Sequence, residues 1–152
     1  MRISEICTEE PVWAGPELTI LEAAKLMRAE HVGCLVIAKA VGERPKPMGI
    51  VTDRDIVVSV VAAGIDPSVF TLGDVTMPEL ATIHEYDDVY EAMRRMRAKG
   101  VRRLPVTDFD GFLKGIVTLD DVISGMADEL KAAAAVIDRE QCREAKTRFA
   151  VR

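Results

Sequence analysis

Cysteine and histidine are scarce in this chain of 152 residues, which contains three cysteines and two histidines. Cys7, Cys34 and Cys142 are odd in number and form no C-x-x-C pair, which argues against a disulfide framework and favours a reducing compartment, the cytoplasm. With no histidine cluster and no EF-hand loop, no metal site built by the protein alone is expected. His31 and Cys34 are three residues apart, and we interpret them as packing residues rather than as a catalytic base and its nucleophile.

Long apolar runs and aromatic residues are also missing. No stretch approaches 18 uncharged apolar residues, so no membrane span is expected, and the start MRISEICTEEPVW does not resemble a signal peptide. Aromatic residues make up 5% of the chain and hydrophobic residues 49%, which predicts a folded, aliphatic core. The net charge is −5, and the basic run RRMRAKGVRR at 94–103 has no interleaved aromatic residue to stack on bases. We therefore expect neither membrane nor nucleic-acid binding.

The chain repeats itself. GIVTDRDIV at 49–57 and GIVTLDDVI at 115–123 share five of nine positions, and EAAKLMRAEHV at 22–32 matches EAMRRMRAKGV at 91–101 in six of eleven. The offsets of 66 and 69 residues differ by three, which one longer turn in the first copy accounts for. We therefore divide the chain into repeat 1 at 1–68, repeat 2 at 69–128 and a helical extension at 129–152.

Each repeat has the same predicted order of elements. A leading strand, a helix, two strands joined by a turn and a second helix follow one another in both copies. Capping-box spacing marks the start of the first helix in each, at Thr19–Glu22 and Asp88–Glu91. One copy cannot cover its own sheet, so we expect an α+β fold in which two copies pack sheet to sheet about a pseudo-twofold axis. Such packing leaves clefts between the copies.

The duplicated Thr-x-x-Asp motif, at Thr52–Asp55 and Thr118–Asp121, has two interpretations. The first is a helix cap, in which the threonine accepts a hydrogen bond from a free backbone N–H and the acid returns one. The second is a nucleoside phosphate site, because a helix start favours anions and a carboxylate accepts hydrogen bonds from ribose hydroxyls. The motif alone does not decide between them.

The duplicated sequence resembles the CBS-domain family, whose repeats are named for cystathionine β-synthase. The resemblance depends on the duplicated G-I-V-T-x-x-D, the V-R-R-L-P-V-T-D strand and the E-A-x-x-x-M helices, and it covers about residues 1–128. It implies a regulatory module, often paired into a homodimer, that binds AMP, ADP, ATP or S-adenosylmethionine and requires no other cofactor. In that family the aspartate of one copy holds the ribose, and the other copy contributes to the base and phosphate contacts.

The resemblance predicts two clefts of unequal charge. The first would bring up to three arginines to a phosphate, and its residues are Thr52, Arg54, Asp55, Thr82, Arg102 and Arg103. The second has no equivalent cation, and its residues are Gly33, Cys34, Thr118 and Asp121. Arginine forms bidentate bonds to phosphate, so we expect the second cleft, with its adjacent Asp120, to bind more weakly, to take a less charged ligand or to stay empty. The alternative is that Arg102 and Arg103 are a solvated strand start.

The long helical segment after Asp121 carries an apolar seam at Met126, Leu130, Ala133 and Ile137, which we interpret as an oligomer interface. The predicted function is a stand-alone adenine-nucleotide sensor that changes its shape or dimer geometry and so alters an unidentified protein partner. One alternative is an interaction or dimerisation module that binds no ligand, in which the motifs are only caps. A small enzyme is the other, but no constellation of nucleophile, base or metal supports it.

Overall fold

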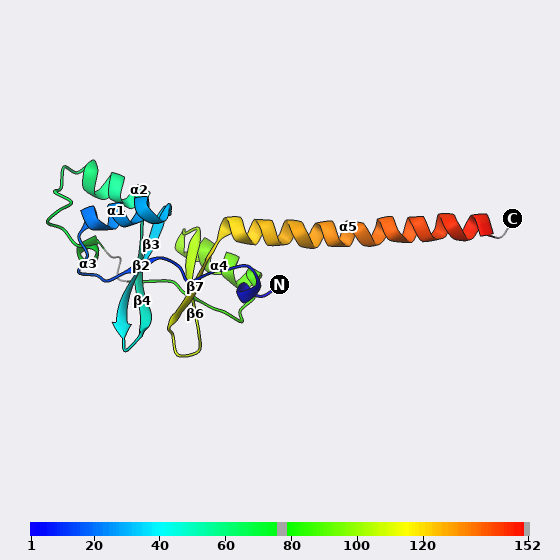
Figure 1. Cartoon of the computed structure of the whole chain (residues 1–152), viewed down its shortest axis with the longest axis horizontal. Helices are drawn as coiled ribbons and strands as arrows, with labels where there is room; N and C mark the ends of the chain where they lie inside the picture. The colour runs from blue at the N-terminus through cyan, green and yellow to red at the C-terminus, as the bar shows by residue number, and fades with distance from the viewer. Residues whose placement is uncertain (76–78, 151–152) are drawn as a thin grey trace.

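The computed structural model describes residues 1–75 and 79–150, with side chains to residue 147. Its first sheet has three strands in the order β2-β3-β4, namely β2 (Trp13–Ala14), β3 (Cys34–Val41) and β4 (Arg44–Thr52). β2 runs parallel to β3, and β3 and β4 form an antiparallel hairpin. Figure 1 shows this sheet beside its own group of helices.

The second sheet has four strands in the order β1-β7-β6-β5. β5 (Ile83–His84), β6 (Arg103–Thr107) and β7 (Leu113–Thr118) repeat the pattern of the first sheet, with a parallel pair followed by an antiparallel hairpin. The fourth strand is β1 (Thr8–Glu9), which comes from the start of the chain and pairs antiparallel with β7.

The first helix of each repeat begins and ends as its sequence predicts. α1 (Ile20–Glu30) begins at a complete capping box between Thr19 and Glu22, and it ends at His31, whose φ of 55° is left-handed. α4 (Val89–Lys99) begins with the Asp88 side chain accepting from the Glu91 N–H at 2.8 Å, and it ends at left-handed Gly100. The second box is therefore half formed, because the Glu91 carboxylate binds Arg94 and Arg95 instead of returning to the cap.

The second helix differs between the repeats. In repeat 1 it is short, with α2 (Asp53–Asp55) followed directly by the π-helical segment η2 (Ile56–Val61). In repeat 2 it is α5 (Leu119–Ala150), which continues far beyond the sheets (Figure 1). Among the described residues no helix has the length and apolar character needed to cross a membrane.

The two repeats exchange their leading segments. η1 (Ile3–Glu5) places Ile3, which is fully buried, in the core of repeat 2. α3 (Leu72–Val75) precedes repeat 2 in sequence, but its buried Leu72 belongs to the core of repeat 1. The boundaries predicted at 68 and 128 therefore divide the sequence repeats, whereas each structural core also contains the other repeat's leading turn.

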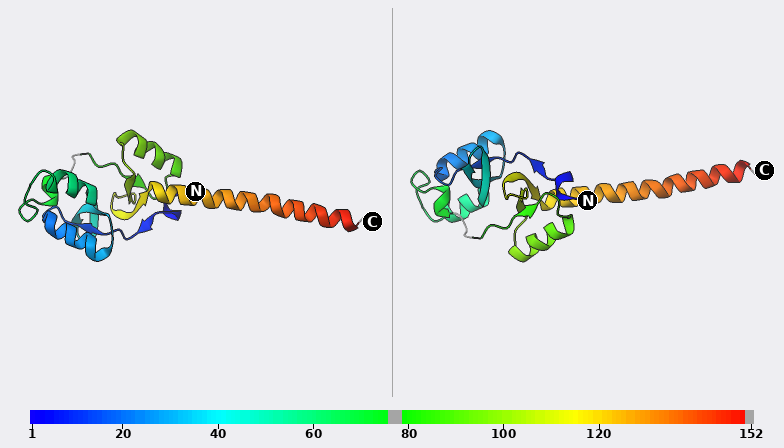
Figure 2. Two further views of the ribbon diagram at one scale, coloured as in Figure 1. Left: turned by 90° about the horizontal axis from the view of Figure 1, so that it is seen from above. Right: turned by 90° about the horizontal axis from the view of Figure 1, so that it is seen from below.

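A third apolar cluster joins the two sheets. Val36 of β3 packs with Leu113 and Ile116 of β7, and Cys34 and Ile50 flank them. Figure 2 shows the two units against each other, with α5 leaving from the second. The predicted α+β architecture of two repeats packed sheet to sheet with a C-terminal helix is confirmed.

Candidate functional site

Both Thr-x-x-Asp motifs form complete capping boxes. At α2 the Thr52 N–H and hydroxyl donate to Asp55 Oδ2 at 2.9 and 2.7 Å, and the Asp55 N–H donates to Thr52 Oγ1 at 3.1 Å. At α5 the matching distances between Thr118 and Asp121 are 2.8, 2.7 and 3.2 Å. The capping interpretation is therefore correct for both. Each carboxylate uses only Oδ2 for its cap, and within the described residues Oδ1 of Asp55 and of Asp121 accepts no hydrogen bond.

A cavity of about 190 Å³ lies beside Asp55. Its walls come from β4, α2, η2, the start of α1 and the end of α3, and they consist of Ile20, Ile50, Val51, Asp55, Ile56, Ser59, Val60 and Val75. One carboxylate and one hydroxyl thus stand in an otherwise aliphatic wall. Both polar residues are exposed, so they mark the open side of the cavity. Such a surface suits an apolar ring that carries hydroxyl groups, because the carboxylate accepts and the aliphatic wall excludes water.

Repeat 2 fills the corresponding place differently. The position that matches Ser59, at the offset of 66 residues, is Gly125. A Cβ atom added there would lie 2.5 Å from Met1 Sδ and 3.1 Å from Ile6 Cγ2, so the N-terminal segment packs directly on this turn of α5. Burial raises the pKa of the neighbouring Cys7 thiol, and the Asp121 carboxylate is among the negative charges that add to this rise. The two clefts are therefore unequal in shape, a difference that the charges in the sequence did not reveal.

The strand starts lie next to the motif of their own repeat. Cys34 is the register partner of Thr52, and the Gly33 carbonyl accepts from the Asp53 N–H at 3.0 Å. Arg103 is likewise the register partner of Thr118. The β-hairpin register fixes each strand start beside the strand end that carries the motif of its own repeat. The predicted contact of each strand start with the motif of the other repeat stays a prediction.

The two arginines at the start of β6 behave differently. The Arg102 guanidinium pairs with Asp120 at 3.2 Å, so a cation lies beside the acid that the sequence assigned to the second cleft. Arg103, by contrast, has no ion pair among the described residues. Burial raises the pKa of the Cys34 thiol, and the positive charge of Arg103 opposes that rise, so its guanidinium lies near repeat 1. Arg103 is thus the cation that the structure brings between the two motifs.

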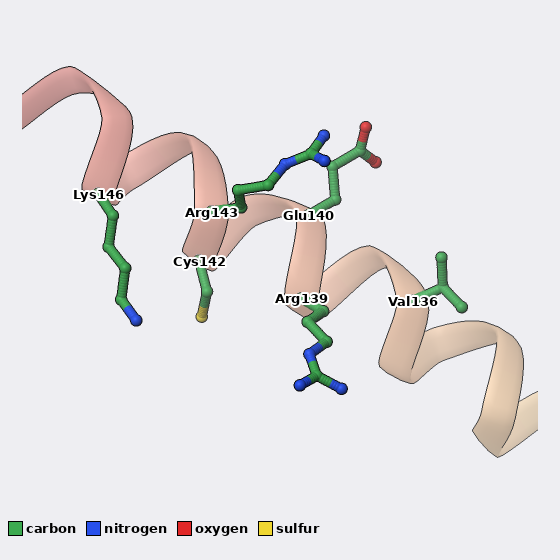
Figure 3. A pocket seen from close by; sticks show the side chains of 6 residues that line it. All are labelled: Val136, Arg139, Glu140, Cys142, Arg143 and Lys146. Carbon is green, nitrogen blue, oxygen red and sulfur yellow. The ribbon is translucent and has the colours of Figure 1, made fainter.

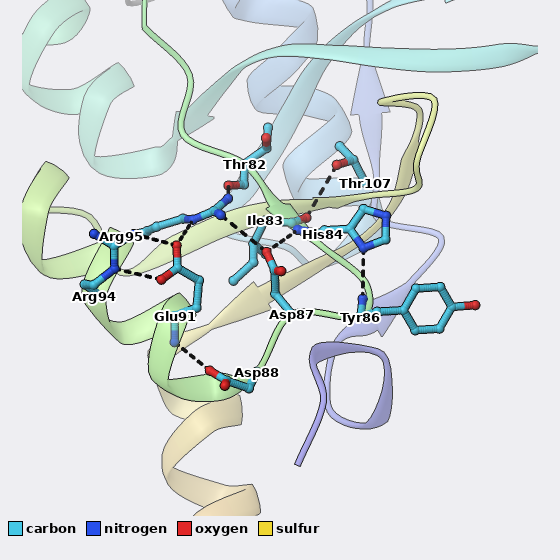
Figure 4. A network of polar contacts seen from close by, with 10 residues as sticks. All are labelled: Thr82, Ile83, His84, Tyr86, Asp87, Asp88, Glu91, Arg94, Arg95 and Thr107. Atoms are coloured by element: carbon cyan, nitrogen blue, oxygen red, sulfur yellow. Dashed lines mark hydrogen bonds and ion pairs between the residues drawn. The ribbon is translucent and has the colours of Figure 1, made fainter.

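Thr82 belongs to a separate polar network at the start of α4 (Figure 4). Its backbone carbonyl accepts from Arg95 Nη1 at 2.6 Å, and Arg95 also pairs with Asp87 and Glu91. Hydrogen bonds from Arg94 and Arg95 lower the pKa of Glu91 to about 2. Neither Thr82 nor Thr52 lines the Asp55 cavity, and the expected approach of these two residues stays a prediction.

A second hollow, along α5, is lined by side chains of that helix alone. Figure 3 shows them projecting from one ribbon, with no second wall; they are Val136, Arg139, Glu140, Cys142, Arg143 and Lys146. All six are exposed, so this hollow is a helix surface and not a ligand cleft in the single chain. The described residues also hold no cluster of three or more histidine, cysteine and acidic side chains placed to bind a metal ion.

The sequence profile of the CBS domain matches the chain twice, at residues 3–62 and 72–128. The chain belongs to the CBS-domain family. An uncharacterised protein from Methanopyrus kandleri is 36% identical over 121 residues, which are 80% of this chain and 60% of that protein. Hypoxic response protein 1 of Mycobacterium tuberculosis is 34% identical over 108 residues, 71% of this chain and 73% of its own.

Solved CBS structures have the same fold. The crystal structure of Hypoxic Response Protein I with two coordinated zinc ions has a TM-score of 0.69 at 31% identity, covering 82% of this chain and 98% of that one. A CBS-domain protein from Pyrobaculum aerophilum complexed with AMP has a TM-score of 0.71 at 26% identity, and the match covers 80% of this chain and 89% of that one. A CBS domain pair in complex with 5′-methylthioadenosine and S-adenosyl-L-methionine has a TM-score of 0.73 at 25% identity, and the match covers 85% of this chain and 98% of that one.

The motif search missed the aliphatic walls of the cavity. Ile20, Ile50 and Val75 come from three elements that only the folded chain brings together. Ser59 was within reach of sequence reasoning, because it follows Asp55 by four residues and so shares its face on a helix. The α3 residues, by contrast, carry no sequence pattern that would have assigned them to the cavity.

Proposed function

We propose that this CBS pair is a regulatory module that binds an adenosine-containing ligand, with AMP, ADP or ATP preferred, at the cavity beside Asp55. The observation that carries the proposal is the free Oδ1 of Asp55 at the open side of an aliphatic cavity. Its Oδ2 holds the cap and fixes the side chain, which leaves Oδ1 to accept from a ribose hydroxyl. The AMP complex and the S-adenosylmethionine complex of related CBS proteins support this ligand class.

Shape and charge favour a ligand that is only partly enclosed. The cavity of about 190 Å³ is smaller than the roughly 300–1,000 Å³ of typical ligand pockets, so it would enclose one part of the nucleotide. The phosphates would then lie outside, where Arg54 and Arg103 have no ion pair among the described residues. A guanidinium without a partner gains more from a phosphate than one that must first leave a carboxylate.

The second cleft would bind more weakly. Arg102 already pairs with Asp120 there, and Met1 and Ile6 pack on Gly125 beside the motif that ends in Asp121. A phosphate bound there would have to displace the ion pair between Arg102 and Asp120. A nucleoside would have to displace the packing on Gly125. A less charged ligand such as S-adenosylmethionine would meet less of this cost.

The module would act through binding and not through catalysis. A ligand shifts a conformational or dimer equilibrium only by its differential affinity for the two states, and the shifted state would then be read by a protein partner in the cytoplasm. The rival proposal is an interaction module without a ligand, and it is favoured by the completeness of both capping boxes, which account for the motifs without a nucleotide.

Isothermal titration of the full chain with AMP, ADP, ATP and S-adenosylmethionine separates these proposals. We expect Asp55→Ala to weaken nucleotide binding by on the order of tenfold or more, about 1.4 kcal/mol. Ser59→Trp, which fills the cavity and leaves the cap intact, should have a similar effect. Glu22→Ala is the matched control, since it removes a capping box of the same kind at α1. No binding by the unaltered chain, or an equal loss in the Glu22 control, would favour the ligand-free module.

A further inference from the structure

The C-terminal two thirds of α5 project from the rest of the chain, and the only ion pair that the described residues of this stretch form outside the helix joins Glu129 to the N-terminus. Every described residue from Asp128 to Thr147 is exposed, and this stretch of 20 residues is about 30 Å long at 1.5 Å per residue. Figure 1 shows it projecting away from both sheets. Most helices in proteins are stabilised by tertiary packing of one apolar face and not by the intrinsic propensity of their residues. The length of α5 therefore calls for a partner.

The exposed surface of α5 carries a continuous apolar seam. Its members are three and four residues apart, the spacing of a coiled-coil seam, and they are Ile123, Met126, Leu130, Ala133 and Ile137. The large ones are exposed by 57% at Ile123, 42% at Met126, 71% at Leu130 and 56% at Ile137. No lone surface helix gains from exposing four such side chains in one line, so the seam is suited to a second helix with the same spacing.

Charge along α5 determines which way that second helix would run. Residues 119–131 contain four acids and one lysine, a net charge of −3. Residues 139–147 contain three basic residues and two acids, a net charge of +1. A second α5 running parallel would place the acidic parts side by side, whereas an antiparallel one separates them and brings Asp120 at the start of one helix towards Arg143 of its partner. Antiparallel helix dipoles add to this preference.

We infer that α5 is a dimerisation helix whose occupant is the α5 of a second copy of this chain, packed antiparallel along the seam at Ile123–Ile137. The twofold axis then passes near Leu130 and Ala133. The basic segment around Arg143 reaches the acidic start of the partner helix, where Asp120 follows β7. The ends of the two helices therefore approach each other's CBS pair. This inference does not depend on the nucleotide proposal, because no residue of the seam lines the Asp55 cavity.

Analytical ultracentrifugation of the full chain tests the dimer. We expect a dimer at micromolar concentration. Leu130→Glu combined with Ile137→Glu should raise its dissociation constant roughly thirtyfold or more, as for hot-spot residues at an interface centre. Ala135→Glu is the matched control, since it adds the same charge to the same helix on the face away from the seam, and it should leave the dimer intact. Circular dichroism checks that each variant remains helical. A monomeric full chain, or a dimer unaffected by the double substitution, overturns the inference.

A spin-label distance tests the orientation. Cys142 is free and exposed, and the other two cysteines are replaced by alanine for this measurement. In the antiparallel pair each label lies about twelve residues beyond the seam's midpoint, so the labels are roughly 35 Å apart. In a parallel pair they lie at the same height, about 20 Å apart or less. A single short distance overturns the antiparallel arrangement even if the dimer forms.

Discussion

At the scale of single residues, the carboxylate of Asp55 combines a structural task with the ligand contact that we propose. Its Oδ2 accepts from the Thr52 N–H and hydroxyl and so fixes the start of α2, while Oδ1 accepts no hydrogen bond among the described residues and lies beside the cavity. Asp121 has the same cap, but the turn of α5 that follows it is covered by Met1 and Ile6. Identical local chemistry therefore leads to different ligand access. The motif itself was readable from the sequence, but the access was not, because it depends on a segment more than 100 residues away along the chain.

Glu91 provides a residue-scale prediction about acid stability. Its pKa is lowered to about 2 from 4.5 by hydrogen bonds from Arg94 and Arg95. A lowered folded-state pKa stabilises the protein above the unfolded pKa, and that contribution is lost as the pH falls from about 4.5 towards 2. Thermal unfolding of the unaltered chain and of Glu91→Gln should therefore differ at pH 7 and converge in acid. Glu43→Gln, at a turn without an ion pair among the described residues, should show no such convergence; a pH-independent difference for Glu91→Gln would contradict this account.

At the scale of elements, sequence reasoning succeeded for most local signals. The capping box at Thr19 and the hairpins of both repeats follow from neighbouring residues, and the structure has them, whereas the box predicted at Asp88 is half formed. It failed for the exchange of leading segments, which comes from the packing of the folded chain. No local pattern contains that information.

The exchanged segments lead to an element-scale prediction. Ile3 lies only three residues from the start of the chain, yet it is fully buried in the core of repeat 2. Ile3→Ala should therefore lower the free energy of unfolding by about 2–5 kcal/mol, the usual cost of a cavity in a packed core. Urea unfolding measures this loss, with Val41→Ala in the exposed end of β3 as the control. A change as small as that of the control would mean that η1 is not part of the core.

At the scale of the whole molecule, two CBS repeats form one unit and α5 extends from it. The duplicated sequence made the pairing of two similar sheets predictable, since each alone lacks cover, and the Val36–Leu113–Ile116 cluster is that contact. The asymmetry between the clefts could not be predicted in the same way. It results from the N-terminal segment, which packs on Gly125 of α5 in repeat 2, whereas the matching Ser59 lines the open cavity in repeat 1.

The central claim is that the Asp55 cavity of repeat 1 takes the adenosine part of a nucleotide. Isoleucine methyl NMR during an AMP titration tests it most directly, because Ile20, Ile50 and Ile56 line the cavity, whereas Ile83 and Ile137 do not. We predict saturable shifts of the first three methyl signals and little change in the other two. No shift at saturating AMP, or shifts confined to isoleucines outside the cavity, would contradict the claim.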